Sequence, residues 1–148
     1  MQAPQIILAV IAASVHGVGS AQCTVPDRSF ESFLERFKND QAFQRSRAGW
    51  PIPVTEVWSY DDENLFPVER TETHFRTHAF FAPPPRTLIV SNAQASELNV
   101  EFAVLETALD TRKVFLGPVR GEADAIYYFA RERGCWDLVR VELHYGAT

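Results

Sequence analysis

Apolar residues recur with helical spacing near the start of the chain. Four large apolar side chains fall at i, i+3, i+4 and i+7: Phe30, Phe33, Leu34 and Phe37. This spacing places them on one face of an amphipathic helix, which Asp27 or Ser29 can cap. Asp40 breaks the pattern and can cap a second short helix over residues 41–48, with Phe43 on its buried face. We therefore expect two consecutive N-terminal helices.

The pattern then changes to that of strands. Prolines at positions 51 and 53 require extended backbone, and residues 52–60 are predicted to form the first strand. Residues 69–82 alternate charged, threonine and aromatic side chains, as a solvent-facing strand does. The three prolines at 83–85 indicate a stiff connector, because proline donates no amide to a sheet. Ser91-Asn92 can then cap a brief helix that ends near Leu98.

The C-terminal half is predicted to be a series of strands. Residues 100–108 alternate, a further strand begins at 114–116, and residues 125–131 and 136–144 form a hairpin that turns at 132–134. In the last strand Trp136 and Leu138 are expected on one face, with Val139, Val141 and Leu143 on the other. Helices followed by antiparallel strands indicate an α+β fold, with N-terminal helices packed on a curved antiparallel sheet.

The N-terminus predicts export. Residues 6–15 form an uncharged apolar run that is too short to span a bilayer, and Gly19-Ser20-Ala21 resembles a signal-peptidase site. We expect a signal peptide at 1–21, a single domain at 22–148, and a periplasmic or secreted location without membrane attachment after cleavage. The net charge of −5, with scattered basic residues, disfavours a nucleic-acid partner.

The chain contains two cysteines, Cys23 and Cys135. In an oxidising compartment two cysteines favour one disulfide, and this one would enclose most of the mature chain. The alternative is a pair of unpaired thiols. We expect the bridge.

Two segments carry a family resemblance. The sequences FQRSRAGWPIPV at 43–54, preceded by FESFLERFKND, and CWDLVRVE at 135–142 resemble a bacterial family of exported proteins of unknown function. That family adopts the nuclear-transport-factor-2-like (cystatin-like) cone, a curved sheet wrapped by N-terminal helices. The resemblance covers both ends of the mature chain and implies this fold. The wider fold includes isomerase-like and dehydratase-like enzymes together with non-catalytic binding and immunity proteins, so it leaves function open.

Five polar or aromatic residues of the last two strands would line the interior of such a cone: Tyr127, Tyr128, Asp137, Glu142 and His144. A carboxylate in an apolar pocket has a raised pKa and can act as a general base. The simpler interpretation is that these side chains form the solvent-exposed face of an alternating strand. No pair with matched acid and base roles is identifiable, so we expect no catalytic residue here.

A further set is expected to be structural or to contact a partner: Gln44, Arg47, Trp50 and Trp136. Arg47 can bridge the second helix to carbonyls or to a carboxylate of the sheet. Alternatively, it recognises an anionic ligand at the mouth of the cone. His74 and His78 would lie roughly 13 Å apart on one strand face, too far to share an ion, so no metal site is expected.

These observations predict a non-catalytic exported module that binds a small ligand or an envelope protein, without a cofactor. One alternative is an immunity-type inhibitor of an envelope effector. Another is a small-molecule enzyme of the isomerase or dehydratase type, which requires an open pocket with a buried acid or base. A homodimer through the second face of the sheet is a further expectation.

Overall fold

The computed structural model describes residues 23–61, 67–77, 88–118 and 124–146. The expected signal peptide, the triple-proline connector and His78 lie outside these residues. The elements follow the order α1 (Phe30–Asn39), α2 (Gln41–Ser46), β1 (Ile52–Asp61), β2 (Pro67–Arg76), α3 (Asn92–Glu97), β3 (Val100–Ala108), β4 (Thr111–Pro118), β5 (Ala125–Glu132) and β6 (Cys135–Gly146).

The two N-terminal helices form where the spacing predicts them. Ser29 caps α1 by accepting a hydrogen bond from the backbone amide of Ser32, and Asp40 caps α2 by accepting one from Phe43. The four apolar residues of the α1 stripe are all buried. The second helix is shorter than expected, because Ala48 forms an isolated parallel bridge with Leu138 of β6 instead of continuing the helix.

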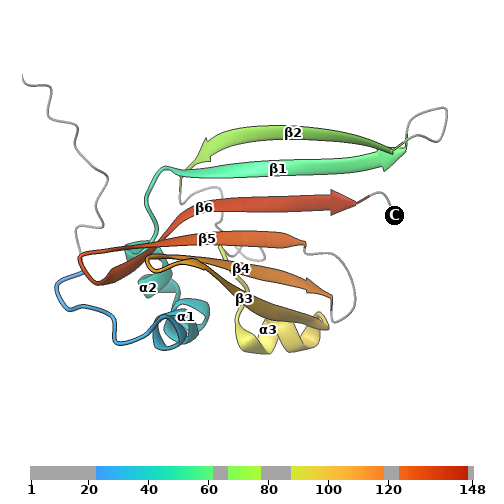
Figure 1. Ribbon diagram of the computed structural model, residues 1–148. Coiled ribbons are helices and arrows are strands. Elements are labelled where there is room, and N and C mark those ends of the chain that lie inside the picture. Colours follow the sequence, from blue (N-terminus) through green and yellow to red (C-terminus); the bar gives the residue numbers. More distant parts are fainter. Residues whose placement is uncertain (1–22, 62–66, 78–87, 119–123, 147–148) are drawn as a thin grey trace, which may run out of the picture.

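The six strands form one sheet in the order β2-β1-β6-β5-β4-β3. The hairpins are antiparallel as expected, but β1 and β6 pair in parallel, with Val54 opposite Val141. The last strand therefore lies between the first hairpin and the strands that precede it in sequence. The labelled helices all lie on the same side of the sheet (Figure 1). We call this side the helix face and the other side the open face.

A bulge in β6 corrects the expected alternation of the last strand. Arg140 pairs with Tyr128 of β5, whereas the next pair joins Phe129 to Leu138, so Val139 is the extra residue. An extra residue shifts the two-residue alternation by one position. Leu138 and Val141 consequently share the helix face, both fully buried, while Val139 is 41% exposed.

Aromatic rings fill the space between α1 and the sheet. Phe129 of β5 contacts three rings of α1, with centroids 5.5 Å from Phe30, 5.6 Å from Phe33 and 5.3 Å from Phe37. Trp136 packs edge-on against Phe30 at 4.9 Å. These edge-to-face arrangements are the favoured geometry for aromatic pairs. The helix face in this region is therefore a packed core.

Candidate functional site

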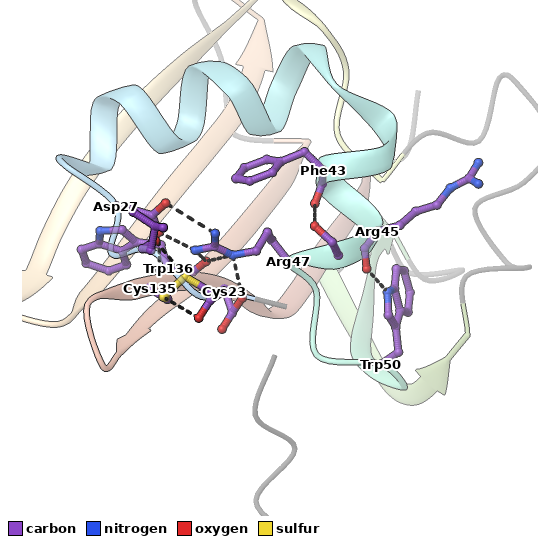
Figure 2. Close-up of polar contacts among 11 residues, drawn as sticks. Cys23, Asp27, Phe43, Arg45, Arg47, Trp50, Cys135 and Trp136 are labelled. Atoms are coloured by element: carbon purple, nitrogen blue, oxygen red, sulfur yellow. Dashed lines mark hydrogen bonds and ion pairs between the residues drawn. A yellow bond between two sulfur atoms is a disulfide. The ribbon is translucent and has the colours of Figure 1, made fainter. Parts of the chain in front are cut away.

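Arg47 lies where three chain segments meet. It follows α2 directly, and its backbone carbonyl accepts a hydrogen bond from the backbone amide of Leu138 of β6 at 2.8 Å. The guanidinium donates to the carbonyl of Trp136 from Nε at 3.0 Å and from Nη2 at 2.7 Å (Figure 2). Its carbon lies 5.2 Å from the ring centroids of Phe33 and Phe43. The arginine is 4% exposed.

Two carboxylates neutralise this buried cation. Asp27 accepts from Nη1 and Nη2 of Arg47, and the same carboxylate accepts the backbone amide of Trp136 at 2.8 Å (Figure 2). Asp137 accepts from Nε at 3.2 Å. A buried charge is tolerated only when it is paired and hydrogen-bonded. The contacts to the Trp136 carbonyl and to Asp137 are of the kind expected from the sequence, whereas Asp27 was expected only as a helix cap.

The segment that carries Asp27 is fastened to the β5–β6 turn at two further points. Cys23 and Cys135 form a disulfide with their Cα atoms 6.2 Å apart. The amide of Asp27 donates to the carbonyl of Gly134 at 3.0 Å. Gly134 has φ of +83°, and a Cβ there would lie 2.8 Å from Cβ of Pro26. The disulfide, the Arg47 ion pair and this turn together hold the start of the domain against its last hairpin.

Gln44 and Trp50 have different surroundings. The indole Nε1 of Trp50 donates to the carbonyl of Arg45 at 2.8 Å, which braces the turn between α2 and β1 (Figure 2). Gln44 is 5% exposed, and its Nε2 donates to the carbonyl of Lys38 at 3.4 Å. This is a long contact for a buried amide.

The five side chains considered for a cone pocket do not form one site. Tyr127 lies on the helix face and is fully buried, and this burial raises the pKa of its phenol. Asp137 belongs to the Arg47 cluster. Only Tyr128, Glu142 and His144 come together, and the sheet register places them on the open face. The interior placement expected for the set is therefore wrong for these three.

These three residues form a hydrogen-bonded group centred on Glu142. Its carboxylate contacts the Tyr128 hydroxyl at 3.1 Å, the His144 Nε2 at 2.7 Å and the Arg140 Nη2 at 2.8 Å. Burial, followed by the charge of Glu142, raises the pKa of Tyr128. Because three donors converge on Glu142, its carboxylate is better placed to fix its neighbours than to abstract a proton.

Two cations flank the Tyr128 ring. The Arg140 guanidinium lies 4.7 Å from the ring centroid, and the Lys113 ammonium lies 5.0 Å from it on the other neighbouring strand. Sequence reasoning missed both cations. Their positions beside Tyr128 follow from the pairing of three strands and from the β6 bulge, neither of which is visible in local patterns. We call Lys113, Tyr128, Arg140, Glu142 and His144 the open-face cluster.

Neither a metal-ligand cluster nor a membrane-spanning helix occurs among the described residues. His74 lies on β2, where its ring contacts Glu72 at 3.3 Å. Within residues 23–61, 67–77, 88–118 and 124–146, no group of three or more potential metal ligands is found. In the same ranges no helix has the length and apolarity needed to cross a membrane.

Solved structures that resemble this chain include two proteins from Bacteroides species. An NTF2-like protein from Bacteroides fragilis NCTC 9343 aligns with a TM-score of 0.45 and 20% identity, over 79% of this chain and 47% of its own. This chain thus spans about half the length of that protein. A cystatin-like protein from Bacteroides caccae ATCC 43185 aligns with a TM-score of 0.47 and 19% identity, over 81% of this chain and 78% of its own. No protein-family model matches the sequence, and no curated protein matches it.

Proposed function

We propose that this chain is an exported, non-catalytic module that binds an acidic envelope protein on the open face of its sheet. The observation that carries the proposal is the open-face cluster, in which Tyr128 is held between Lys113 and Arg140 on a face without a described helix. Tyrosine and arginine are the residues that most often dominate the energy of protein interfaces. Glu142 already holds the side chains of Tyr128 and Arg140 in place, so these two side chains lose little conformational entropy on binding.

Apolar side chains on the same face support a protein partner. Phe75 is 73% exposed, Leu105 is 50% exposed and Val139 is 41% exposed, and sheet register places Phe75 and Leu105 in the cross-strand row of Arg140 and Tyr128. The exposed apolar groups Phe75 and Leu105 lie on the edge strands β2 and β3, on either side of the central cations and Tyr128. Aromatic residues and arginine are among the types enriched in protein interfaces.

The charge balance favours an acidic partner over a second copy. Lys113 and Arg140 outnumber Glu142 locally, whereas the whole chain carries −5. A twofold dimer through the centre of this face would bring the two sets of cations together, and like charges across an interface are unfavourable. A partner that presents Asp or Glu beside an apolar residue complements the cluster. An immunity-type inhibitor is the narrower version of this proposal, with an envelope effector as the acidic partner.

Export is supported by the N-terminal apolar run and by the Cys23–Cys135 disulfide. Disulfides persist mainly in the periplasm and outside the cell. Secretion of the full-length chain in a bacterial host, with mass measurement of the periplasmic product, tests this part. We expect the product to begin at Gln22. A full-length product in the cytoplasm would contradict export.

The binding proposal is tested by titrating the oxidised chain with a glutamate-rich peptide that contains leucine, monitored by amide-detected NMR. We expect shifts that concentrate on the open face and weaken with salt. Tyr128→Ala should remove about 2 kcal/mol of binding energy, as a central aromatic anchor does. Lys113→Gln and Arg140→Gln should each weaken binding. Arg45→Gln, on the exposed side of α2 and away from the open face, should leave binding unchanged. Unchanged binding in the Tyr128 variant, or a dimer that this variant abolishes, would overturn the proposal.

The hydrogen-bonded set of Tyr128, Glu142 and His144 supports a second candidate, an acid–base enzyme of the isomerase or dehydratase type. In that case His144 is the proton-transfer group, and Glu142 orients it. Proton transfer to carbon is favoured where water is excluded, and this set lies on the sheet face away from α1. We therefore rank binding first. Turnover that disappears in His144→Gln while peptide binding persists would reverse the ranking.

A further inference from the structure

The two edges of the sheet differ in how well they resist pairing with another strand. Among the described strands, β2 and β3 are the outermost (Figure 1). Charged side chains along an edge discourage the addition of a strand, and β2 carries four of them: Glu69, Arg70, Glu72 and Arg76. The sequence of β3 is VEFAVLETA, which contains no lysine, arginine or proline. The edge formed by β3 is therefore the less protected one.

Apolar side chains gather along this edge. Val104 and Leu105 lie on β3, and Leu98 and Leu109 lie just beyond its two ends. All four side chains are at least half exposed. An edge strand with exposed apolar residues is a template to which a strand of another chain can add by main-chain hydrogen bonds.

The regular part of β3 limits where an added strand can pair. The pairing of β3 with β4 is continuous from Val100 to Glu106, and Thr107 then forms a one-residue bulge. A bulge bends its strand and disrupts the ladder locally. An added strand therefore pairs regularly with residues 100–106, whose central residue is Ala103.

We propose that β3 pairs antiparallel with β3 of a second copy of this chain, about a twofold axis at Ala103, so that the two sheets become one. Opposite residues of an antiparallel pair point to the same face of the sheet, and neighbouring residues point to opposite faces. A twofold axis must consequently place one residue opposite itself. Ala103 is that residue because it lies at the centre of the regular stretch, and it is small and exposed.

The apolar residues next to Ala103 are complementary in this register. Val104 pairs with Val114 of β4, whose fully buried side chain belongs to the helix face, so Val104 and Phe102 both lie on that face. Phe102 of each copy then lies opposite Val104 of the other. Pairs of an aromatic and a β-branched residue are among the favourable cross-strand pairs, and this one occurs twice by symmetry.

The two acidic residues of β3 are also accommodated in this register. Glu101 lies opposite Leu105 of the other copy, and Glu106 lies opposite Val100. No two carboxylates therefore lie directly opposite each other, which would be unfavourable. Glu106 is also neutralised within its own chain by Arg112, at 2.9 Å. This self-complementary arrangement of charges is the observation that favours a second copy as the occupant of the edge.

The dimer leaves the open face free. Its axis is perpendicular to the sheet, because each residue and its opposite point to the same face. The two open-face clusters consequently lie on the same side of the joined sheet. This arrangement differs from a dimer through the open face, which would bring the cations of two clusters together, and it does not depend on the binding of an acidic partner.

The test is sedimentation equilibrium of the oxidised chain at concentrations up to about 1 mM, where even a weak dimer forms. We expect a monomer–dimer equilibrium. Ala103→Lys and Ala103→Glu each place like charges opposite each other at the axis, and each should raise the dissociation constant of the dimer about tenfold or more. An equal mixture of the two variants should restore the dimer, because lysine then faces glutamate.

Thr71→Lys is the matched control, because Thr71 is an exposed residue on β2, the opposite edge. It should leave the dissociation constant unchanged. Restoration of the dimer in the mixture also excludes misfolding as the reason for dissociation. A native chain that stays monomeric up to about 1 mM would overturn the proposal, as would a dimer that persists in both Ala103 variants. Assemblies larger than a dimer would indicate head-to-tail pairing of β3 with β2 and would overturn the twofold axis.

Discussion

Arg47 holds Asp27 against the backbone amide of Trp136, although the three residues come from the end of α2, the segment before α1 and β6. One carboxylate thus accepts hydrogen bonds from both the arginine side chain and the backbone amide of Trp136. The guanidinium in turn donates twice to the carbonyl of Trp136. Arg47, Asp27 and the backbone of Trp136 thus form one connected hydrogen-bond network beside the aromatic core.

Removing the arginine should strongly destabilise the domain. In Arg47→Ala the carboxylates of Asp27 and Asp137 stay near the core without their cation, which costs about 3–5 kcal/mol. Arg47→Lys should lose less, because it retains the charge but not the forked geometry. Urea unfolding monitored by tryptophan fluorescence measures both. Arg45→Ala, on the exposed side of the same helix, is the control, and an equal loss there would refute the role of the ion pair.

The disulfide should contribute a large part of the remaining stability. It joins residues separated by 112 positions, and the chain-entropy model gives about 4–5 kcal/mol for a loop of that size. We expect the double variant Cys23→Ser/Cys135→Ser to unfold at much lower urea concentration. A thiol reductant should bring the native chain to the same midpoint and leave the double variant unchanged. A reductant effect on the double variant would indicate another cause.

Gly134 should not tolerate a side chain. Its φ of +83° is unfavourable for other residues, and a Cβ would collide with Pro26. Gly134→Ala should therefore cost about 1–3 kcal/mol. Gly146→Ala serves as the matched control, because nothing lies within 4 Å of its added Cβ. Equal thermal stability of the two variants would contradict this account of the turn.

Two tyrosines should ionise later than free tyrosine. Burial raises the pKa of Tyr127, and burial together with the Glu142 charge raises that of Tyr128. The native state therefore holds these protons more tightly than the unfolded chain. Their contribution to stability is fully present below the unfolded pKa of about 10 and is lost as pH rises through the folded-state values.

Near-ultraviolet absorbance during alkaline titration measures this ionisation. We expect the tyrosinate signal of Tyr127 to appear only together with unfolding, and Tyr127→Phe should remove that late component. Tyr128→Phe should remove a second component that also rises above the usual pH. A full tyrosinate signal near pH 10 in the folded chain would exclude burial as the controlling factor.

Local patterns predicted much of the fold. The stripe of Phe30, Phe33, Leu34 and Phe37 predicted α1, and the structure has the third strand at residues 100–108 as expected. The Ser91 cap and the β5–β6 hairpin also agree with the sequence. These features depend on contacts between residues close in sequence, or on an alternation that persists over a whole strand.

The candidate sites were less accessible to such reasoning. The sequence by itself determined which segments are helix or strand and which cysteines are available to pair. It also indicated that Arg47 can bridge the second helix to polar groups of the sheet. Only the tertiary structure decided that Asp27 is its partner, that β1 lies parallel to β6, and that a bulge at Val139 moves Val141 to the helix face. The physical reason is that register and long-range pairing depend on how whole strands pack together. A one-residue shift in that packing reverses which side chains face the core and which form the open-face cluster.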